Sequence, residues 1–132
     1  MINEELFTRL TADATVSGLV VSRIYPHRAR FTPTYPHIIY EVTGDEPAYA
    51  FSGPISFKEA NIVYQCIADR YRDAKTIAAA VESSLTGFRG TLTTHFVHAL
   101  FIDGVRDGKI QTTEDADSFY YAVNVAVSVH YE

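Results

Sequence analysis

The chain has 132 residues, of which 47% are hydrophobic and 20% charged, and its formal net charge at pH 7 is −5. These values are typical of a globular protein with one core and argue against a disordered chain. The negative charge argues against a general nucleic-acid binder, because phosphate contacts need concentrated Lys and Arg. We therefore expect a single domain over residues 1–132, with a charge that is still compatible with transient passage of DNA.

The first half of the chain predicts one helix and one regular strand. We expect the helix from Asn3 to about Asp13, because its apolar side chains recur on one face. Residues 27–36 are basic and contain prolines, which favours a loop. Residues 37–43 alternate apolar and polar side chains and predict a strand that the turn residues 44–47 end.

Residues 48–57 carry Phe51, Ile55 and Phe57 around the Gly53-Pro54 pair. The segment is too apolar for an idle loop and too interrupted for a central strand. We interpret residues 48–57 as a long hairpin tip, and call it the arm. Residues 60–68 then predict a strand that is partly covered on both faces.

A helix is predicted over Tyr71–Leu85, with Asp69 as its N-cap and Gly87 as its stop. Its apolar face repeats at helical spacing and comprises Ala74, Ile77, Ala78, Val81 and Leu85. Because two of these residues are alanines, the helix can approach a sheet closely. Helix on sheet is therefore the expected core.

The last third of the chain predicts a long hairpin. Residues 91–102 predict a strand, residues 103–118 a polar and acidic connection, and Phe119–Tyr131 a strand that alternates over its whole length. Antiparallel pairing is the simplest topology, because the connection has no helical period. The expected fold class is α+β, an antiparallel sheet with two main helices in the order α-β-β-α-β-β.

One segment superficially fits a calcium-binding loop. Asp103, Asp107, Gly108 and Glu114 match its first, fifth, sixth and twelfth positions, but Val105 at the third offers no side-chain oxygen. The flanking segments also predict strands rather than helices. We assign no metal and expect a solvated hairpin loop.

Candidate catalytic residues are few. His95 and His98 are expected on opposite faces of a strand, with no carboxylate at ligand spacing, and are interpreted as structural or surface residues. Cys66 is the only cysteine, which excludes an internal disulfide, and its apolar strand face favours a small buried side chain over a nucleophile. We find no catalytic motif and expect neither an enzyme nor a cofactor.

Residues 1–10 lack the basic-then-apolar layout of a signal peptide, and no apolar run approaches membrane-spanning length. The sequence therefore predicts a protein made in a cytoplasm, with no membrane contact.

The order of these signals resembles the tail completion proteins of long-tailed bacteriophages, the tail-to-head joining or tail terminator family. The resemblance rests on short apolar motifs, of which Arg23-Ile24-Tyr25-Pro26 is the sharpest; the others are Thr11-Ala12-Asp13-Ala14, Pro36-His37-Ile38-Ile39-Tyr40 and the strand-to-helix order of residues 62–85. It implies a subunit that forms a ring, commonly a hexamer, at the head-proximal end of the tail tube. Such a ring stops tube growth and docks neck or head-completion proteins, and no catalytic residues carry over.

Site predictions therefore come from the residues themselves. We expect a subunit interface formed by Phe51, Ile55 and Phe57 of the arm together with Arg28 and Arg30, and an acidic loop at the lumen or rim of the ring. The acidic residues are Asp103, Asp107, Glu114, Asp115 and Asp117. Basic and acidic runs are usually solvated surface, but opposite charges can also meet across a subunit boundary.

Two other readings of the sequence stay open. The chain could be a small ligand-binding or enzymatic α+β module that acts as a dimer, with a pocket lined by tyrosines. It could also be another ring subunit of a virion, from the neck or the tail tube.

Overall fold

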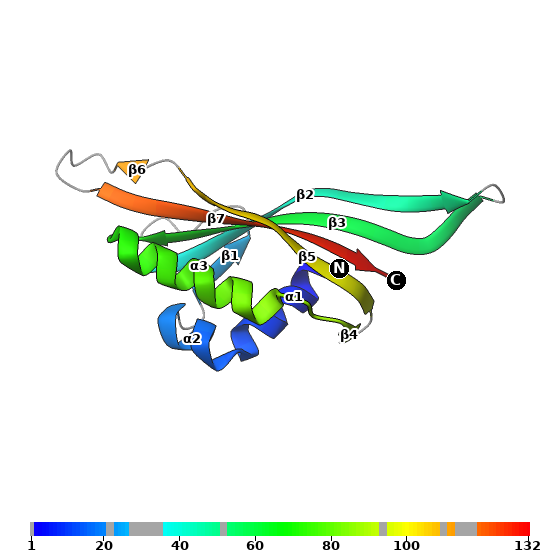
Figure 1. Cartoon of the computed structure of the whole chain (residues 1–132), viewed down its shortest axis with the longest axis horizontal. Coiled ribbons are helices and arrows are strands. Elements are labelled where there is room, and N and C mark those ends of the chain that lie inside the picture. Colours follow the sequence, from blue (N-terminus) through cyan, green and yellow to red (C-terminus); the bar gives the residue numbers. More distant parts are fainter. Residues whose placement is uncertain are drawn as a thin grey trace.

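The structure is a computed structural model of the chain that describes residues 2–20, 23–26, 36–50, 53–92, 95–108, 111–112 and 119–132. Within these ranges, the side chains of residues 3, 46–50, 53–57, 111–112 and 119–120 are not described. Helices lie along one side of a curled sheet, and a two-stranded ribbon projects from one end of the body (Figure 1). The α+β class expected from the sequence is confirmed.

Three helices are described: α1 (Ile2–Ala12), α2 (Ala14–Val20) and α3 (Tyr71–Leu85). The short helix α2 was not predicted. It is separated from α1 by Asp13, whose carboxylate Oδ1 accepts hydrogen bonds from the backbone N–H groups of Thr15 at 2.9 Å and Val16 at 3.1 Å. This is the arrangement of a helix N-cap, so Asp13 ends one helix and starts the next.

Helix α3 has the predicted bounds, but its predicted cap is wrong. The residue before the helix is Arg70 in an extended conformation, and no side chain caps the first turn among the described residues. At the other end Gly87 has a φ of 67°, a conformation that glycine adopts without the strain of a Cβ. Gly87 therefore acts as the predicted stop.

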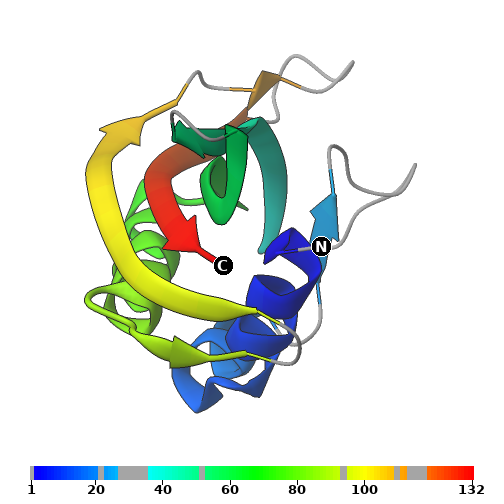
Figure 2. The same ribbon diagram turned by 90° about the vertical axis from the view of Figure 1, so that its right-hand side faces the viewer.

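The described strands form one curled sheet, whose path follows the order β1-β2-β3-β7-β5-β4, with β6 also pairing with β7 (Figure 2). Their bounds are β1 (Ile24–Pro26), β2 (His37–Ala50), β3 (Gly53–Ala68), β4 (Gly90–Thr91), β5 (Phe96–Asp107), β6 (Gln111–Thr112) and β7 (Phe119–Tyr131). Pairing is antiparallel except between β1 and β2, which run parallel. The sheet is thus mixed rather than purely antiparallel.

Two strands run further than the sequence predicted. β2 does not end at the turn residues 44–47 but continues to Ala50, with register shifts on either side of Thr43 and of Ala48. β5 continues to Asp107, with register shifts at His98 and Asp103. At Thr43, His98 and Asp103 one extra residue forms a β-bulge, whereas at Ala48 one residue of β2 lies opposite residues 55–57 of β3. The ladder resumes after each irregularity.

The core lies between the helices and one face of the sheet. The alternate valines of β7, from Val123 to Val129, are at most 1% exposed and pack with Ile77, Val81 and Leu85 of α3. Burying each such side chain is worth about 1.5–3 kcal/mol. The opposite face of the sheet, which we call the open face, carries Asn124, Ala126 and Ser128 from β7.

Candidate assembly surfaces

The arm is the part of the β2–β3 hairpin that extends beyond the body of the sheet. The last pair between β3 and β7 is Lys58 with Tyr131, so residues 53–57 extend beyond β7, and of these Pro54 and Gly53 pair with Tyr49 and Ala50 of β2. The ribbon is closed by the pair Ala50 with Gly53. Figure 1 shows the ribbon running well past the C-terminus, with no other described element beside its tip.

A chain of polar contacts fixes the base of the arm to the body. The hydroxyl of Tyr131, at the end of β7, donates to the carboxylate of Asp45 on β2, with O···O distances of 2.8 and 3.0 Å. The ring of His95 stands edge-on to the Tyr131 ring, with 5.2 Å between centroids. His95 in turn contacts the carboxylate of Glu5 through its ring Nδ1 and through its backbone N–H. We call Glu5, His95, Tyr131 and Asp45 the arm bracket.

The electrostatics of the arm bracket follow from this geometry. Burial raises the pKa of the Tyr131 hydroxyl, and its hydrogen bond to Asp45 and the charges of Asp45 and Glu5 raise it further. Tyr131 therefore stays protonated and remains a hydrogen-bond donor. Glu5 is 8% exposed, and its carboxylate is compensated by the two contacts to His95. α1 is thereby linked to β2 and to the end of β7.

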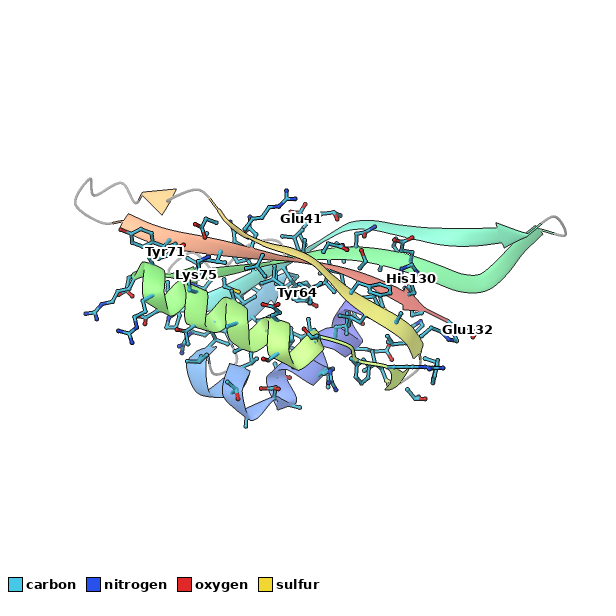
Figure 3. All side chains as sticks on the ribbon, viewed as in Figure 1. Glu41, Tyr64, Tyr71, Lys75, His130 and Glu132 are labelled. Atoms are coloured by element: carbon cyan, nitrogen blue, oxygen red, sulfur yellow. The ribbon has the colours of Figure 1, made fainter. Side chains whose placement is uncertain are left out.

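The open face of the sheet is polar and shallow, and no helix among the described residues covers it. A hollow of about 260 Å³ is lined by Val63, Asp103, Gly104, Arg106, Asn124 and Ala126. A smaller hollow of about 160 Å³ lies beside it, lined in part by Glu41, which Figure 3 shows on the side of the sheet away from α3. Such open hollows suit contact with another protein surface better than enclosure of a small ligand.

Outer strand β5 carries most of the exposed apolar surface. Among the described residues, the large apolar side chains that are clearly exposed are Phe96, Phe101 and Val105 on β5 and Tyr71 on α3. The Phe101 ring packs edge-on against His130, with 5.6 Å between centroids, and the Phe96 ring packs in the same way against His98, with 4.8 Å. Figure 3 places His130 and Glu132 near the end of β7.

The comparisons with known proteins give this fold its context. The family model of tail completion protein gp17 matches residues 4–131. The chain belongs to this family. It is therefore a structural component of a phage tail. A search of curated proteins found no match to the chain.

Two solved structures share the fold of this tail completion protein. A chain from the virion of a native gene transfer agent particle superimposes with a TM-score of 0.69 at 21% identity, covering 96% of this chain and 91% of that one. A second chain superimposes with a TM-score of 0.60 at 15% identity, covering 99% of this chain and 93% of that one. The described helices of the tail completion protein include none long and apolar enough to cross a bilayer.

The predicted interface residues are only partly described. Arg28, Arg30 and Phe51 lie outside the described residues, as do the side chains of Ile55 and Phe57. The backbone of residues 53–57 lies in the arm, which is a hairpin tip as the sequence predicted. Contact of these residues with another chain therefore stays a prediction.

The predicted acidic loop is partly strand. Asp103 and Asp107 lie in β5, and because of the bulge at Asp103 they point to opposite faces of the sheet. Asp103 accepts a hydrogen bond from Ser128 on the open face. Asp107 instead contacts α3, accepting from the Tyr71 hydroxyl at 2.9 Å and lying 3.0 Å from Lys75 Nζ. These contacts, that of Lys75 first, lower the pKa of Asp107.

The other acidic positions, Glu114, Asp115 and Asp117, lie outside the described residues. The strand conformation of Asp103 and Asp107 is incompatible with a calcium loop that begins at Asp103. Within the described part of the chain, no three His, Cys, Asp or Glu side chains gather closely enough to hold a metal ion.

The sequence predicted no carboxylate near His95 or His98, but each of them has one. A carboxylate from a distant segment meets each of them: Glu5 contacts His95, and Glu132 lies 3.0 Å from His98 Nε2. No spacing rule along the sequence could have found the Glu5 contact, because the two residues are 90 positions apart. Cys66 is fully buried as predicted, and burial raises the pKa of its thiol to about 12, which removes it as a nucleophile at neutral pH.

Proposed function

We propose that this tail completion protein forms a closed ring, with six copies as the expected number, at the head-proximal end of the tail tube. There it ends tube growth and presents a docking surface to a head-completion or neck protein. The observation that carries the proposal is the arm, which leaves the body of a tail protein and has no partner among the described residues. A two-stranded ribbon is marginally stable alone in water, so the arm is expected to rest on another chain.

The contacts between copies are assigned to the arm and to the basic segment. Phe51, Ile55 and Phe57 supply apolar side chains on the arm, and interfaces are enriched in such aromatic anchors. We assign Arg28 and Arg30 to contacts with acidic residues of a neighbouring copy. Complementary charges of this kind set the register and orientation of partners more than their affinity.

The acidic residues are assigned to the lumen or rim of the ring. Glu114, Asp115 and Asp117, with Asp103 on the open face and Asp107 on the opposite face, are five of the sixteen acidic residues of the chain. DNA in transit carries the same sign, so a negative lumen lets it slide without being held. The protein would be assembled in the host cytoplasm and retained in the virion at the junction of tail and neck, between the tail-tube protein and the head.

Native mass spectrometry of the purified protein tests this function. We expect a closed six-membered ring, whereas a dimer would favour the ligand-binding module and open-ended tubes a tail-tube subunit. A variant with Phe51, Ile55 and Phe57 changed to serine should elute as a monomer. An oligomer unchanged by the triple substitution would contradict the assigned interface.

The biological test uses particles produced without this protein. Loss of a tail terminator should give tails of irregular, excessive length that fail to join heads, visible by negative-stain electron microscopy. Tails of normal length that nevertheless fail to join heads would contradict the role in ending tube growth.

A further inference from the structure

The outer side of β5 is the least covered apolar surface that the structure describes. Phe101, which pairs with Ser128 of the open face, is 55% exposed, and Phe96 is 36% exposed. Val105 is 37% exposed but pairs with Val125 of the core face, so it points to the other side of the sheet. β5 pairs with β7 along one side, whereas on its other side β4 covers only Phe96 and Val97. From His98 to Asp107 no described strand pairs with the outer edge of β5. An exposed apolar strand at a sheet edge marks a contact surface.

The arm is the second uncovered feature, and within one copy it cannot reach β5. Figure 1 shows the arm pointing away from the body, past the end of β7. The outer edge of β2 is paired with β1 only at residues 38–40, so the ribbon is open on that side as well. Its sequence is rich in apolar residues, including Tyr49, Ile55 and Phe57. Each copy thus carries two uncovered apolar features that can meet only between copies.

We propose that the arm of one copy lies along the outer side of β5 of a second copy, on Phe101 at the open face. This inference rests on the proposed ring, and it names the surface that receives the arm. Phe101 supplies the most exposed aromatic ring, and the edge-on His130 ring fixes its orientation. A pre-oriented aromatic side chain is an effective anchor, because little rotamer freedom is lost on binding.

Side chains rather than a continuous backbone ladder carry this contact. β5 is interrupted by bulges at His98 and Asp103, and the β2–β3 ladder by a bulge at Thr43 and by unpaired residues at Ala48 and 55–57. Pro47 and Pro54 also lack the N–H that a ladder needs. Bulges and prolines at sheet edges prevent unlimited strand addition. The edge therefore accepts one arm without starting an open-ended sheet.

The size of the contact explains why a ring is needed. Residues 53–57 extend beyond the last pair with β7 and, at about 3.3 Å per residue, span about 17 Å, the length of one ordinary strand. A stable interface buries about 800 Å² per partner, so one arm cannot hold a dimer by itself. In a ring every copy gives one arm and receives another, and closure adds the contacts between bodies.

Cysteine cross-linking tests the assignment directly. Ser56→Cys on the arm is combined with Phe101→Cys on β5, and the purified protein is oxidised with copper phenanthroline. Native Cys66 is fully buried and does not compete. The matched control combines Ser56→Cys with Thr76→Cys, which is exposed on α3. We expect a ladder of covalent multimers on non-reducing gels for the first pair, at least tenfold stronger than for the control.

A ladder of equal strength in both pairs, or no ladder for the Phe101 pair, would overturn the assignment. If native mass spectrometry still finds rings in that case, only the assigned surface that receives the arm is wrong. If the wild-type protein forms no rings and no ladder appears, the proposed function fails together with the inference. Circular dichroism checks that the variants fold, and Ala99→Cys, which pairs with His130 on the same face as Phe101, replaces Phe101→Cys if that variant does not.

An independent variant tests the surface that receives the arm without a cross-link. Phe101→Asp places a charge on the exposed side of β5 and should lower the fraction of rings at least tenfold at a fixed concentration. Thr76→Asp is the charge-matched control and should leave the fraction unchanged. A ring fraction that Phe101→Asp does not alter would overturn the proposal.

Discussion

The Tyr131 hydroxyl reaches across β3 to the carboxylate of Asp45, at 2.8 and 3.0 Å, and so joins the last residue of β7 to the base of the arm. Ala60 lies on β3 between the two strands, paired with Asp45 on one side and with Val129 on the other. The direction of the arm is therefore set by contacts far from its tip.

Tyr131→Phe is expected to destabilise the fold by about 1 kcal/mol. The change removes the hydrogen bond to Asp45, and the loss stays moderate because Asp45 is exposed and water can replace the donor. Urea unfolding followed by circular dichroism measures the change at one fixed protein concentration, since assembly adds to apparent stability. An unchanged midpoint would show that this hydrogen bond contributes nothing to the stability of the fold.

Tyr64→Phe is the contrasting substitution and should leave stability unchanged or raise it by up to about 1 kcal/mol. Tyr64 is 1% exposed, and its hydroxyl has no hydrogen-bond partner among the described residues. Removing an unpaired buried hydroxyl relieves a desolvation penalty while the ring still fills its space. The same urea experiment measures the change. A loss of stability comparable to that of Tyr131→Phe would show that the Tyr64 hydroxyl has a hydrogen-bond partner.

Alkaline pH should destabilise the protein in two stages. Burial raises the pKa of the Cys66 thiol from 9.0 to about 12, and it also raises the pKa of Tyr64 above 10.0. These groups therefore lose their protons at a lower pH in the unfolded chain than in the folded protein. The free energy of unfolding has its full value below about pH 9 and falls as the pH rises toward the pKa values of the folded protein. In Cys66→Ala the decline should begin about one pH unit later. Unfolding midpoints between pH 7 and 11 test this order.

Asp13→Ala should cost about 1 kcal/mol, the usual value of a helix N-cap. Hydrogen bonding to the backbone of Val16 is the main cause that lowers the pKa of Asp13 below 3.8. The contribution of Asp13 is then present above about pH 4 and is lost as pH falls through the lowered pKa. Stabilities of wild type and variant should converge near pH 2. Asp13→Asn keeps a capping oxygen, so it should retain most of the stability at pH 7.

The sequence predicted well those elements whose pattern is local. α3 and β7 have the bounds read from their periodicity, because both bury one regular face against the same core. β2 was expected to end before Gly44, since Gly-Asp-Glu-Pro is a typical turn sequence. In the structure the proline is tolerated because β2 is an outer strand there, and a bulge at Thr43 absorbs the misfit.

The candidate site was less accessible to sequence reasoning. The arm was expected from its apolar content, but the arm bracket joins residues as far apart as Glu5 and His95, which no local pattern connects. Asp103 and Asp107 were grouped as one acidic surface by their closeness in sequence. The bulge between them separates their side chains, a feature that alternation alone does not encode.

The arm bracket also has a consequence for the geometry of assembly. When each arm rests on the next copy, the angle between arm and body becomes the rotation from one subunit to the next. A constant rotation that divides a full turn closes a ring, whereas a slightly different one gives a helix without end. In the proposed ring, the number of copies would then depend on the angle at the base of the arm, where Tyr131 contacts Asp45. Substitutions there would change how many copies close the circle before they change whether copies associate.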